Sequence, residues 1–251
     1  MRGKSLRVLV VAAFGLGLLV LAPPASAQPP VDFEEETHFR CYTISNQTPE
    51  PANLVTLDDQ FLPPTTLSVD EPELFCAPTS KNGLPIEEPE EHLTTYNAPR
   101  PLEPDLTVST EDQFGPRTLR LTGARELYVP TQKLVGDLGF PRRLNHYWCY
   151  EASGPKVAQT VTLDDQFGSD TVRVERPHRF CNPVEKVSEA GRFRIIEREV
   201  HLTCYEIFGP QKTVAQTFGV LNQFETDDFT VTSHQLLCVP SAKLGFTPIS
   251  G

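Results

Sequence analysis

The hydrophobic positions along the chain form short segments rich in Val, Thr, Phe, Tyr and Leu, and Pro or Gly interrupts these segments repeatedly. Segments of this length and composition are typical of β-strands rather than helices. The clearest are Val157–Phe167 (VAQTVTLDDQF) and Thr171–Glu175, in which apolar and polar residues alternate. Arg192–Tyr205 alternates approximately and is expected to be one long strand. The chain is therefore predicted to be all-β.

This strand pattern recurs in four tandem copies. Each copy opens with a histidine, and the histidines are spaced by 54, 54 and 55 residues. An Asp-Gln-Phe or Asn-Gln-Phe triplet follows, and a Cys or Tyr then stands two residues before a proline and five before a lysine. Landmarks that recur in the same order predict tandem β repeats. The predicted units are a signal peptide at 1–27 and repeats 1 to 4 at 28–88, 89–140, 141–192 and 193–251.

Repeat 2 contains no cysteine, and it has Thr95 and Tyr128 where the other copies have a cysteine pair. Two cysteines bonded to each other would be lost together, because either one alone would be a stranded thiol. The joint absence therefore selects one of the fifteen connectivities that six cysteines allow. A bridge between repeats, the alternative, would not explain the joint absence. The predicted disulfides are Cys41–Cys76, Cys149–Cys181 and Cys204–Cys238.

The bridges also suggest how the repeats are arranged. A unit of this size buries only a thin core and often needs a covalent staple. Repeat 2 lacks the staple, so we expect it to depend on its neighbours and residues 89–140 alone not to fold. Because the other copies are each stapled internally, a row of small β modules is favoured. The alternative is a closed four-bladed β-propeller, in which the two ends of the chain would have to close a ring.

The Asp-Gln-Phe triplet is interpreted as a turn. In repeats 2 and 3 a glycine follows it, and Asp at the first position with Gly at the fourth is typical of a type I β-turn. An Asp or Asn side chain can accept backbone N–H groups in such a turn. The predicted turn residues are Asp59, Asp112, Asp165 and Asn222. The phenylalanines that follow are expected to fold back as core plugs: Phe61, Phe114, Phe167 and Phe224.

Two metal sites are conceivable from the sequence, and neither is favoured. Paired carboxylates at Asp58-Asp59 and Asp164-Asp165 offer the oxygen ligands that calcium prefers, but the spacing of an EF-hand is absent and turn caps explain them better. His38 and Cys41 recur together as zinc ligands do. A sulfur atom in a disulfide cannot serve as a thiolate ligand, and repeat 2 keeps His92 although it lacks both cysteines. Both facts argue against a zinc site. No cofactor is predicted, with calcium as the alternative.

Tyr147, Trp148 and Tyr150 cluster in one predicted strand, and aromatic side chains can stack on sugars or grip a protein partner. In a strand, Trp148 and Tyr150 would share one face while Tyr147 and Cys149 face the other way. One of these faces must pack on the core, so core packing is favoured. A binding face that contains these three aromatic residues is the alternative.

The N-terminus has the form of a secretory signal peptide. Basic residues at positions 2, 4 and 7 precede an apolar run, Val8–Leu21, and Ala25-Ser26-Ala27 fits a cleavage site before Gln28. The run is shorter than the roughly 20 residues of a spanning helix, and no later segment is apolar for long enough to span a bilayer. We expect cleavage near Ala27 and a mature chain in an oxidising compartment, either periplasmic or extracellular.

Charge and motifs narrow the functional classes. The formal net charge of −11 would repel nucleic acid, so no nucleic-acid partner is expected. The mature sequence contains no G-x-S-x-G, H-E-x-x-H, P-loop or G-x-G-x-x-G motif, and nearly all its distinctive residues belong to the repeat. We therefore expect a non-catalytic secreted or cell-surface protein that binds a glycan, a polymer or an extracellular protein. The alternatives are a hydrolase that uses carboxylates outside any motif and a disulfide-stapled protease inhibitor.

The motifs H-x-x-C-Y, V-T-L-x-D-Q-F-G and C-x-P-x-x-K resemble a tandem repeat of secreted bacterial proteins of unknown function. Lys81-Asn82-Gly83 also fits a K-N-G that often follows the last cysteine in that family. The resemblance extends from His38 to Lys243, and repeat 2 departs from it by lacking both cysteines. It implies tandem modules and a secreted protein, and it implies no activity.

Overall fold

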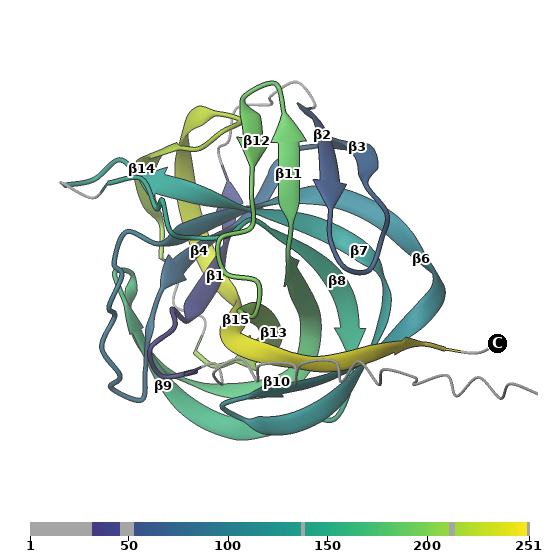
Figure 1. The fold of residues 1–251 in the computed structure, drawn as a ribbon. Helices are drawn as coiled ribbons and strands as arrows, with labels where there is room; N and C mark the ends of the chain where they lie inside the picture. The colour runs from purple at the N-terminus through teal and green to yellow at the C-terminus, as the bar shows by residue number, and fades with distance from the viewer. Residues whose placement is uncertain (1–31, 46–52, 137–138, 211–213, 250–251) are drawn as a thin grey trace, which may run out of the picture.

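The computed structural model describes residues 32–45, 53–136, 139–210 and 214–249, and all regular structure in these ranges is β-strand (Figure 1). The all-β prediction is thus confirmed. The predicted signal peptide lies outside the described residues. The strands are β1 Phe39–Ser45, β2 Asn53–Asp58, β3 Thr65–Val69, β4 Pro72–Pro78, β5 Ser80–Lys81, β6 His92–Asp112, β7 Gly115–Lys133, β8 Tyr147–Ser153, β9 Gln159–Asp165, β10 Gly168–Pro183, β11 Glu185–Ser188, β12 Gly191–Phe193, β13 His201–Phe208, β14 Gln216–Leu221 and β15 Thr226–Pro248.

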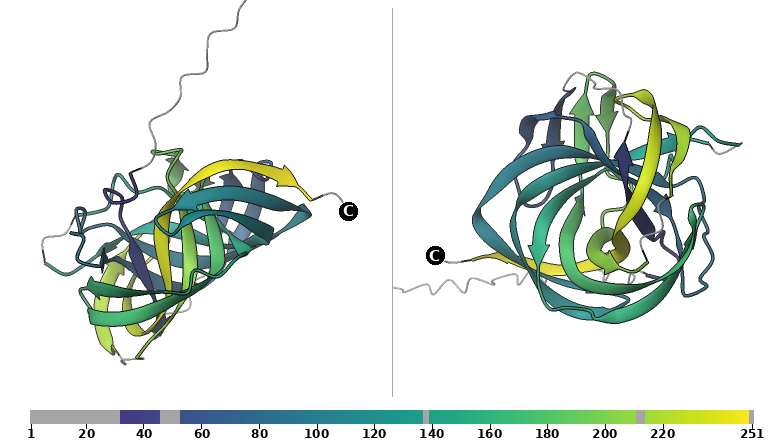
Figure 2. Two further views of the ribbon diagram at one scale, coloured as in Figure 1. Left: turned by 90° about the horizontal axis from the view of Figure 1, so that it is seen from below. Right: turned by 180° about the vertical axis from the view of Figure 1, so that it is seen from behind.

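One closed antiparallel cylinder (Figures 1 and 2) is formed by eight of the strands: β1, β4, β6, β7, β8, β10, β13 and β15. Each repeat contributes the two strands that carry its first and last cysteine positions, and these two strands pair with each other. Successive repeats are joined by the pairs β4–β6, β7–β8 and β10–β13. The pairing of β15 with β1 joins repeat 4 back to repeat 1 and closes the ring.

The four repeats are therefore not the row of separate modules that the internal staples favoured. In a row, each repeat would complete its own sheet, whereas here half of the ladders in the ring join one repeat to the next. Nor does each repeat form its own radiating sheet, as a propeller blade would. All four share one interior and depend on one another for their core.

The interior contains the three predicted disulfides, which are confirmed as Cys41–Cys76, Cys149–Cys181 and Cys204–Cys238. Each bridge joins residues that lie directly opposite each other on the two cylinder strands of one repeat.

Repeat 2 keeps this register without a bridge, because Thr95 lies opposite Tyr128. The Tyr128 side chain is fully buried in the same cluster as all six cysteines, and its hydroxyl lies 3.9 Å from Cys204 Sγ. The tyrosine therefore occupies interior space near the position where repeat 2 lacks a fourth bridge.

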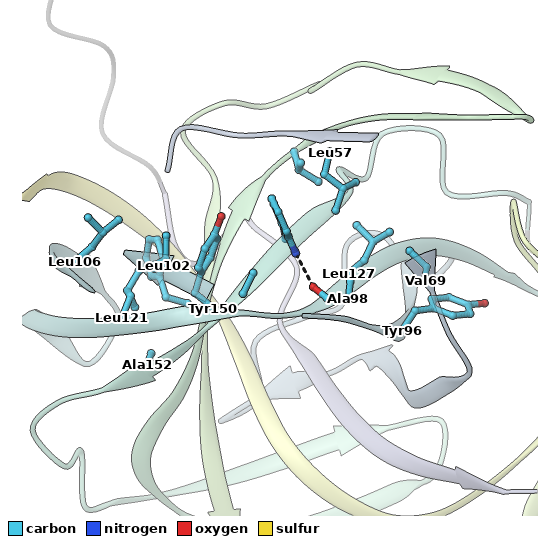
Figure 3. Close-up of a cluster of buried hydrophobic side chains, with 14 of the residues drawn as sticks. Leu57, Val69, Tyr96, Ala98, Leu102, Leu106, Leu121, Leu127, Tyr150 and Ala152 are labelled. Carbon is cyan, nitrogen blue, oxygen red and sulfur yellow. Dashed lines mark hydrogen bonds between the residues drawn. The ribbon is translucent and has the colours of Figure 1, made fainter. Parts of the chain in front are cut away.

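The outer face of the cylinder is covered by β-hairpins, one from each repeat, that carry the Asp-Gln-Phe or Asn-Gln-Phe turn. The segment that follows the last cysteine position of a repeat pairs with the hairpin of the repeat two places along the chain. This gives the ladders β5–β9, β7–β14, β11–β2 and β15–β6. The largest outer cluster includes the indole of Trp148, whose Nε1 donates a hydrogen bond to the Ala98 carbonyl at 3.1 Å (Figure 3).

The prediction of one long strand over Arg192–Tyr205 is wrong. β12 begins at Gly191, whose φ of 125° suits glycine, and it pairs back on β11 only as far as Phe193. The backbone then leaves the sheet. Asn145 holds this segment, since its amide donates to the Glu197 carbonyl and accepts from the Ile196 N–H. β13 begins only at His201.

Candidate functional site

The turn residues of the four triplets bind the backbone of their own turns, as the sequence pattern indicated. In each repeat the side-chain Oδ1 of Asp or Asn accepts the N–H of the phenylalanine two residues later, at 2.8–2.9 Å. The residues concerned are Asp59, Asp112, Asp165 and Asn222. Their first role is therefore local and structural.

The same side chains also join repeats that are two places apart. Tyr42 donates to Asp165 Oδ2 and Tyr150 donates to Asp59 Oδ2, each at 2.7 Å, and Tyr205 donates to Asp112 Oδ2. Repeat 4 makes the contact with an amide, because Asn222 donates to the Tyr96 hydroxyl at 2.6 Å.

Burial accompanies these contacts. It raises the pKa of Asp59, Asp112 and Asp165, although their hydrogen bonds oppose that shift. Within the described ranges, no group of three or more His, Cys, Asp or Glu side chains is placed to hold a metal ion.

The phenylalanine of each triplet connects three repeats. Its ring packs edge-on against the tyrosine of the repeat two places away, as Phe167 does against Tyr42 with ring centroids 4.8 Å apart. The lysine that follows the last cysteine position of the preceding repeat lies over the same ring. These lysines are Lys81, Lys133, Lys186 and Lys243, at 5.5, 4.9, 4.3 and 4.9 Å from the ring centroids. The recurring Phe and Lys therefore act as clamps between repeats.

The histidine that opens each repeat is buried and neutral. Burial lowers its pKa to about 4 in His38 and His92 and to about 3 in His146 and His201. The triplet glutamine of the following repeat bonds to two of these rings, since Gln166 donates to His92 Nε2 and His146 Nε2 donates to Gln223, each at 2.9 Å.

The core packing predicted for the three aromatic residues is confirmed, and the alternative, an exposed aromatic binding face, is not present. Tyr147, Trp148 and Tyr150 are all buried, with at most 2% of their surface exposed. Tyr147 faces the cysteine-lined interior, whereas Trp148 and Tyr150 lie in the outer cluster under the hairpins. The expected alternation of faces is present, and both faces are covered by other strands.

A hollow of about 570 Å³ lies at one end of the cylinder, and we call it the mouth. Most of its lining residues follow the first cysteine position of a repeat or precede the last one, and these positions meet at the same end because the strands are antiparallel. The lining residues are Thr43, Glu73, Leu74, Glu126, His178, Glu206, Ile207, Phe208, His234, Gln235 and Leu236.

The mouth breaks the fourfold pattern of the chain. Two residues before the last cysteine position, the four repeats have Leu74, Glu126, Arg179 and Leu236. The landmark residues are alike in all copies, whereas these positions differ in charge and size. A structural repeat with locally different side chains at one end is the arrangement expected of a site built on a repeated frame.

A buried ion pair stands at the edge of the mouth. Arg179 donates to both carboxylate oxygens of Glu126, from Nε at 3.0 Å and from a terminal nitrogen at 2.7 Å. Both residues are less than a tenth exposed. A bidentate pair of this kind is rigid, so it fixes the shape of this wall and leaves no net charge there.

Other titratable side chains face the hollow without such a strong partner. His178 Nδ1 lies 3.7 Å from a Glu206 oxygen. Burial and then the charge of Glu126 raise the pKa of Glu73, and burial lowers the pKa of His178. The mouth therefore places the carboxyl groups of Glu73 and Glu206 beside an imidazole whose lowered pKa favours the uncharged form.

The floor and rim of the mouth are partly apolar. Ile207 and Leu236 are buried, while 58% of the Phe208 surface is exposed at the rim. His234 Nδ1 lies 2.8 Å from a guanidinium nitrogen of the buried Arg40, which ties the floor to an internal charge network. The mouth thus combines an exposed aromatic ring with acceptors and an imidazole, which suits a small polar ligand with apolar faces.

The mouth residues were not predicted from the sequence, because they belong to no motif. One signal does exist in the chain: positions next to the cysteines that differ among otherwise similar repeats. The sequence does not show that these positions meet at one end of a ring. Their variation therefore gives no sign of a site until the fold is known.

Comparisons with known proteins reach only to the repeat itself. A family model described as "Repeat of unknown function (DUF7450)" matches residues 92–240, which is more than half of the chain. No curated protein and no solved structure matches the chain. In the part of the chain that the structure covers, no helix has the length and hydropathy to cross a membrane.

Proposed function

The chain belongs to the family of this repeat of unknown function (DUF7450), and we propose that it is a secreted, non-catalytic protein that binds part of a glycan in the mouth of the cylinder. The observation that carries the proposal is the mouth itself. Its volume of about 570 Å³ lies within the usual range of small-molecule sites, about 300–1,000 Å³. It is also a place where the repeats diverge in charge and size.

The chemistry of the lining supports a ligand rich in hydroxyl groups. Glu73 and Glu206 line the hollow, and an ionised carboxyl group can accept hydrogen bonds from two neighbouring hydroxyls. The exposed ring of Phe208 offers a flat apolar surface to the C–H face of a sugar ring. The bridged Glu126–Arg179 pair adds a rigid polar wall.

Secretion is part of the proposal and rests on two features of the chain. The N-terminal sequence has the basic, apolar and small-residue regions of a signal peptide. The six cysteines are all paired in the structure, and such disulfides persist in oxidising compartments. A glycan outside the cytoplasm is consistent with both.

The proposal is tested by binding of neutral oligosaccharides to the mature chain, first on a glycan array and then by calorimetry. Phe208→Ala and Glu206→Gln should each weaken a glycan hit by about tenfold or more, because each removes a principal contact. Leu244→Ala is the matched control, since Leu244 is 61% exposed outside the mouth. If the mouth variants bind as tightly as the control, the mouth is not the site.

A hydrolase is the second candidate, and the raised pKa of Glu73 favours it. Glycosidases use a protonated carboxylic acid together with a second carboxylate, and Glu206 lines the same hollow. Release of new reducing ends from a bound oligosaccharide, abolished in Glu73→Gln, would replace the non-catalytic proposal. Binding without any cleavage would leave the non-catalytic proposal standing.

A further inference from the structure

A second hollow of about 260 Å³ lies at the opposite end of the cylinder, and we call it the arginine groove. It forms between the segment that leads into β8 and the segment at and after β12. Its position follows from the register, because all its lining residues except Gln223 lie between the last cysteine position of one repeat and the first cysteine position of the next. The lining residues are Pro130, Phe140, Pro141, Arg142, Leu144, His146, Arg192, Phe193, Arg194, Ile196 and Gln223.

The groove carries positive charge in an acidic protein. Three arginines line it, although the formal net charge of the chain is −11. Arg192 pairs with Glu185. Arg142 and Arg194 are exposed, and neither forms an ion pair with any acid in the described ranges. Two guanidinium groups are therefore available to a ligand.

The charge at this place differs from that in the other repeats. The residues just before the opening histidine include acids in repeat 1 (Glu34–Glu36), in repeat 2 (Glu90-Glu91) and in repeat 4 (Glu197 and Glu199, on either side of Arg198). Repeat 3 has Arg142 and Arg143 at the corresponding place. Arg142 is thus a local departure from the repeat pattern, and neither Arg142 nor Arg194 takes part in the His–Gln or Lys–Phe contacts that join the repeats.

The walls of the groove are aromatic and apolar. The ring of Phe193 lies 5.2 Å from the His146 ring and 4.6 Å from Lys186 Nζ, measured to ring centroids, so these two buried groups hold it in place. Phe140 and Ile196 add apolar surface, and Ile196 is 46% exposed. At the base, His146 Nε2 donates to Gln223 Oε1.

We propose that the arginine groove binds a small monocyclic carboxylate, that is, a six-membered ring bearing one carboxylate group. Guanidinium groups match a carboxylate with two parallel hydrogen bonds. The Phe193 and Phe140 rings suit a flat or puckered ring. A hollow of about 260 Å³ has room for a single ring with its acid group, and it is too small for a peptide or an oligosaccharide. Uronic acids and aromatic acids both supply this chemistry.

Calorimetry on the mature chain tests the proposal with benzoate and methyl glucuronide as probes. Benzyl alcohol and methyl glucoside are the matched neutral probes, and sulfate tests for simple anion binding. At least one ring carboxylate should bind about tenfold or more tightly than its neutral analogue and than sulfate. Binding of benzoate alone identifies an aromatic acid, binding of the glucuronide alone identifies a uronic acid, and binding of both supports the whole class.

The double variant Arg142→Gln with Arg194→Gln should lose this binding. Arg120→Gln with Arg173→Gln is the control, because both arginines are exposed and paired with acids elsewhere. Phe193→Leu keeps every charge of the groove and should weaken the ring probe, so it provides a second test if the arginine variant folds poorly. No binding at millimolar concentrations, equal binding of sulfate, or full binding by the double variant or by Phe193→Leu would overturn the proposal.

Discussion

Repeats 2 and 3 occupy the same interior layer of the cylinder with different chemistry. In repeat 3 the two strands are joined by Cys149–Cys181. In repeat 2 the same register places Thr95 opposite Tyr128, and the tyrosine extends into the shared interior toward Cys204. A covalent bond joins the two cylinder strands of repeat 3. In repeat 2 a buried side chain packs in the interior instead.

This difference shows which features define the repeat. The bridge is present in three copies, whereas the opening histidine, the Gln-Phe pair, the proline and the lysine are present in all four. Except for the proline, these shared residues make contacts from one repeat to another. Cohesion of the molecule therefore comes first from contacts between repeats, and the bridges add to it.

Acid should cause the largest loss of stability, because the buried histidines occur in every repeat, with or without a bridge. Their pKa in the folded chain is about 4 or 3, against an ordinary value of 6.5. Between pH 6.5 and about 4 the unfolded chain therefore binds more protons, so stability falls as the pH falls. From pH 7 to 5 each histidine should contribute about 1 to 2 kcal/mol of this loss.

Urea unfolding at pH 7 and pH 5 measures this effect. Buried Asp59, Asp112 and Asp165 act in the opposite direction, since their raised pKa values favour the folded state as they take up protons. His92→Gln in repeat 2 and His146→Gln in repeat 3 should flatten the pH dependence by similar amounts. Equal stability of the wild-type protein at the two pH values would refute the prediction.

Tyr128→Ala should destabilise the protein by about 3–5 kcal/mol, the usual loss for removing a large buried aromatic side chain. Tyr128 is fully buried among the cysteines, so its removal leaves a cavity in the interior that all four repeats share. Chemical denaturation gives the change, with exposed Leu54→Ala as the control. A loss below about 1 kcal/mol would mean that the interior closes around the gap.

Replacing both Cys149 and Cys181 by Ala should cost about 2–4 kcal/mol, since the bridge closes a loop with a sequence separation of 32 residues. The protein should still fold, because repeat 2 adopts the same register with no bridge. Strand content by circular dichroism and a cooperative melt check this outcome. Failure to fold would show that the contacts between repeats do not suffice.

The smallest net effect is expected when repeat 2 is given a bridge. Thr95→Cys with Tyr128→Cys places two cysteines directly opposite each other, and mass spectrometry should show that the bridge forms. Stability should not rise, because the gain of about 2–4 kcal/mol from the bridge offsets the loss of the tyrosine. A clear rise in melting temperature would contradict the space-filling role of Tyr128.

Much of the local structure could be predicted from the chain alone. Alternation indicated strands, the joint absence at Thr95 and Tyr128 selected the disulfides, and Asp59 caps its turn as its position suggested. Each of these inferences concerns residues that are close in the chain or equivalent by repetition. Local preferences are sufficient for such features.

The ring and the mouth could not be predicted in this way. Nothing in the sequence of β15 states that it pairs with β1, since that choice depends on the summed pairing of all repeats. Arg192–Tyr205 alternates, yet Asn145 fixes part of it outside the sheet through contacts about 50 residues apart in sequence. Glu126 and Arg179 form a pair only because the ring brings repeats 2 and 3 together.

The contacts between repeats two places apart have a consequence for evolution by duplication. In an open solenoid an extra unit lengthens the molecule, because each unit contacts only its neighbours. Here a fifth copy would have no diagonal partner, and it would separate β15 from β1. The number of units is therefore locked at four in this ring. Substitutions at the two ends of the cylinder can therefore change what the molecule binds there, while the ring of four units stays the same.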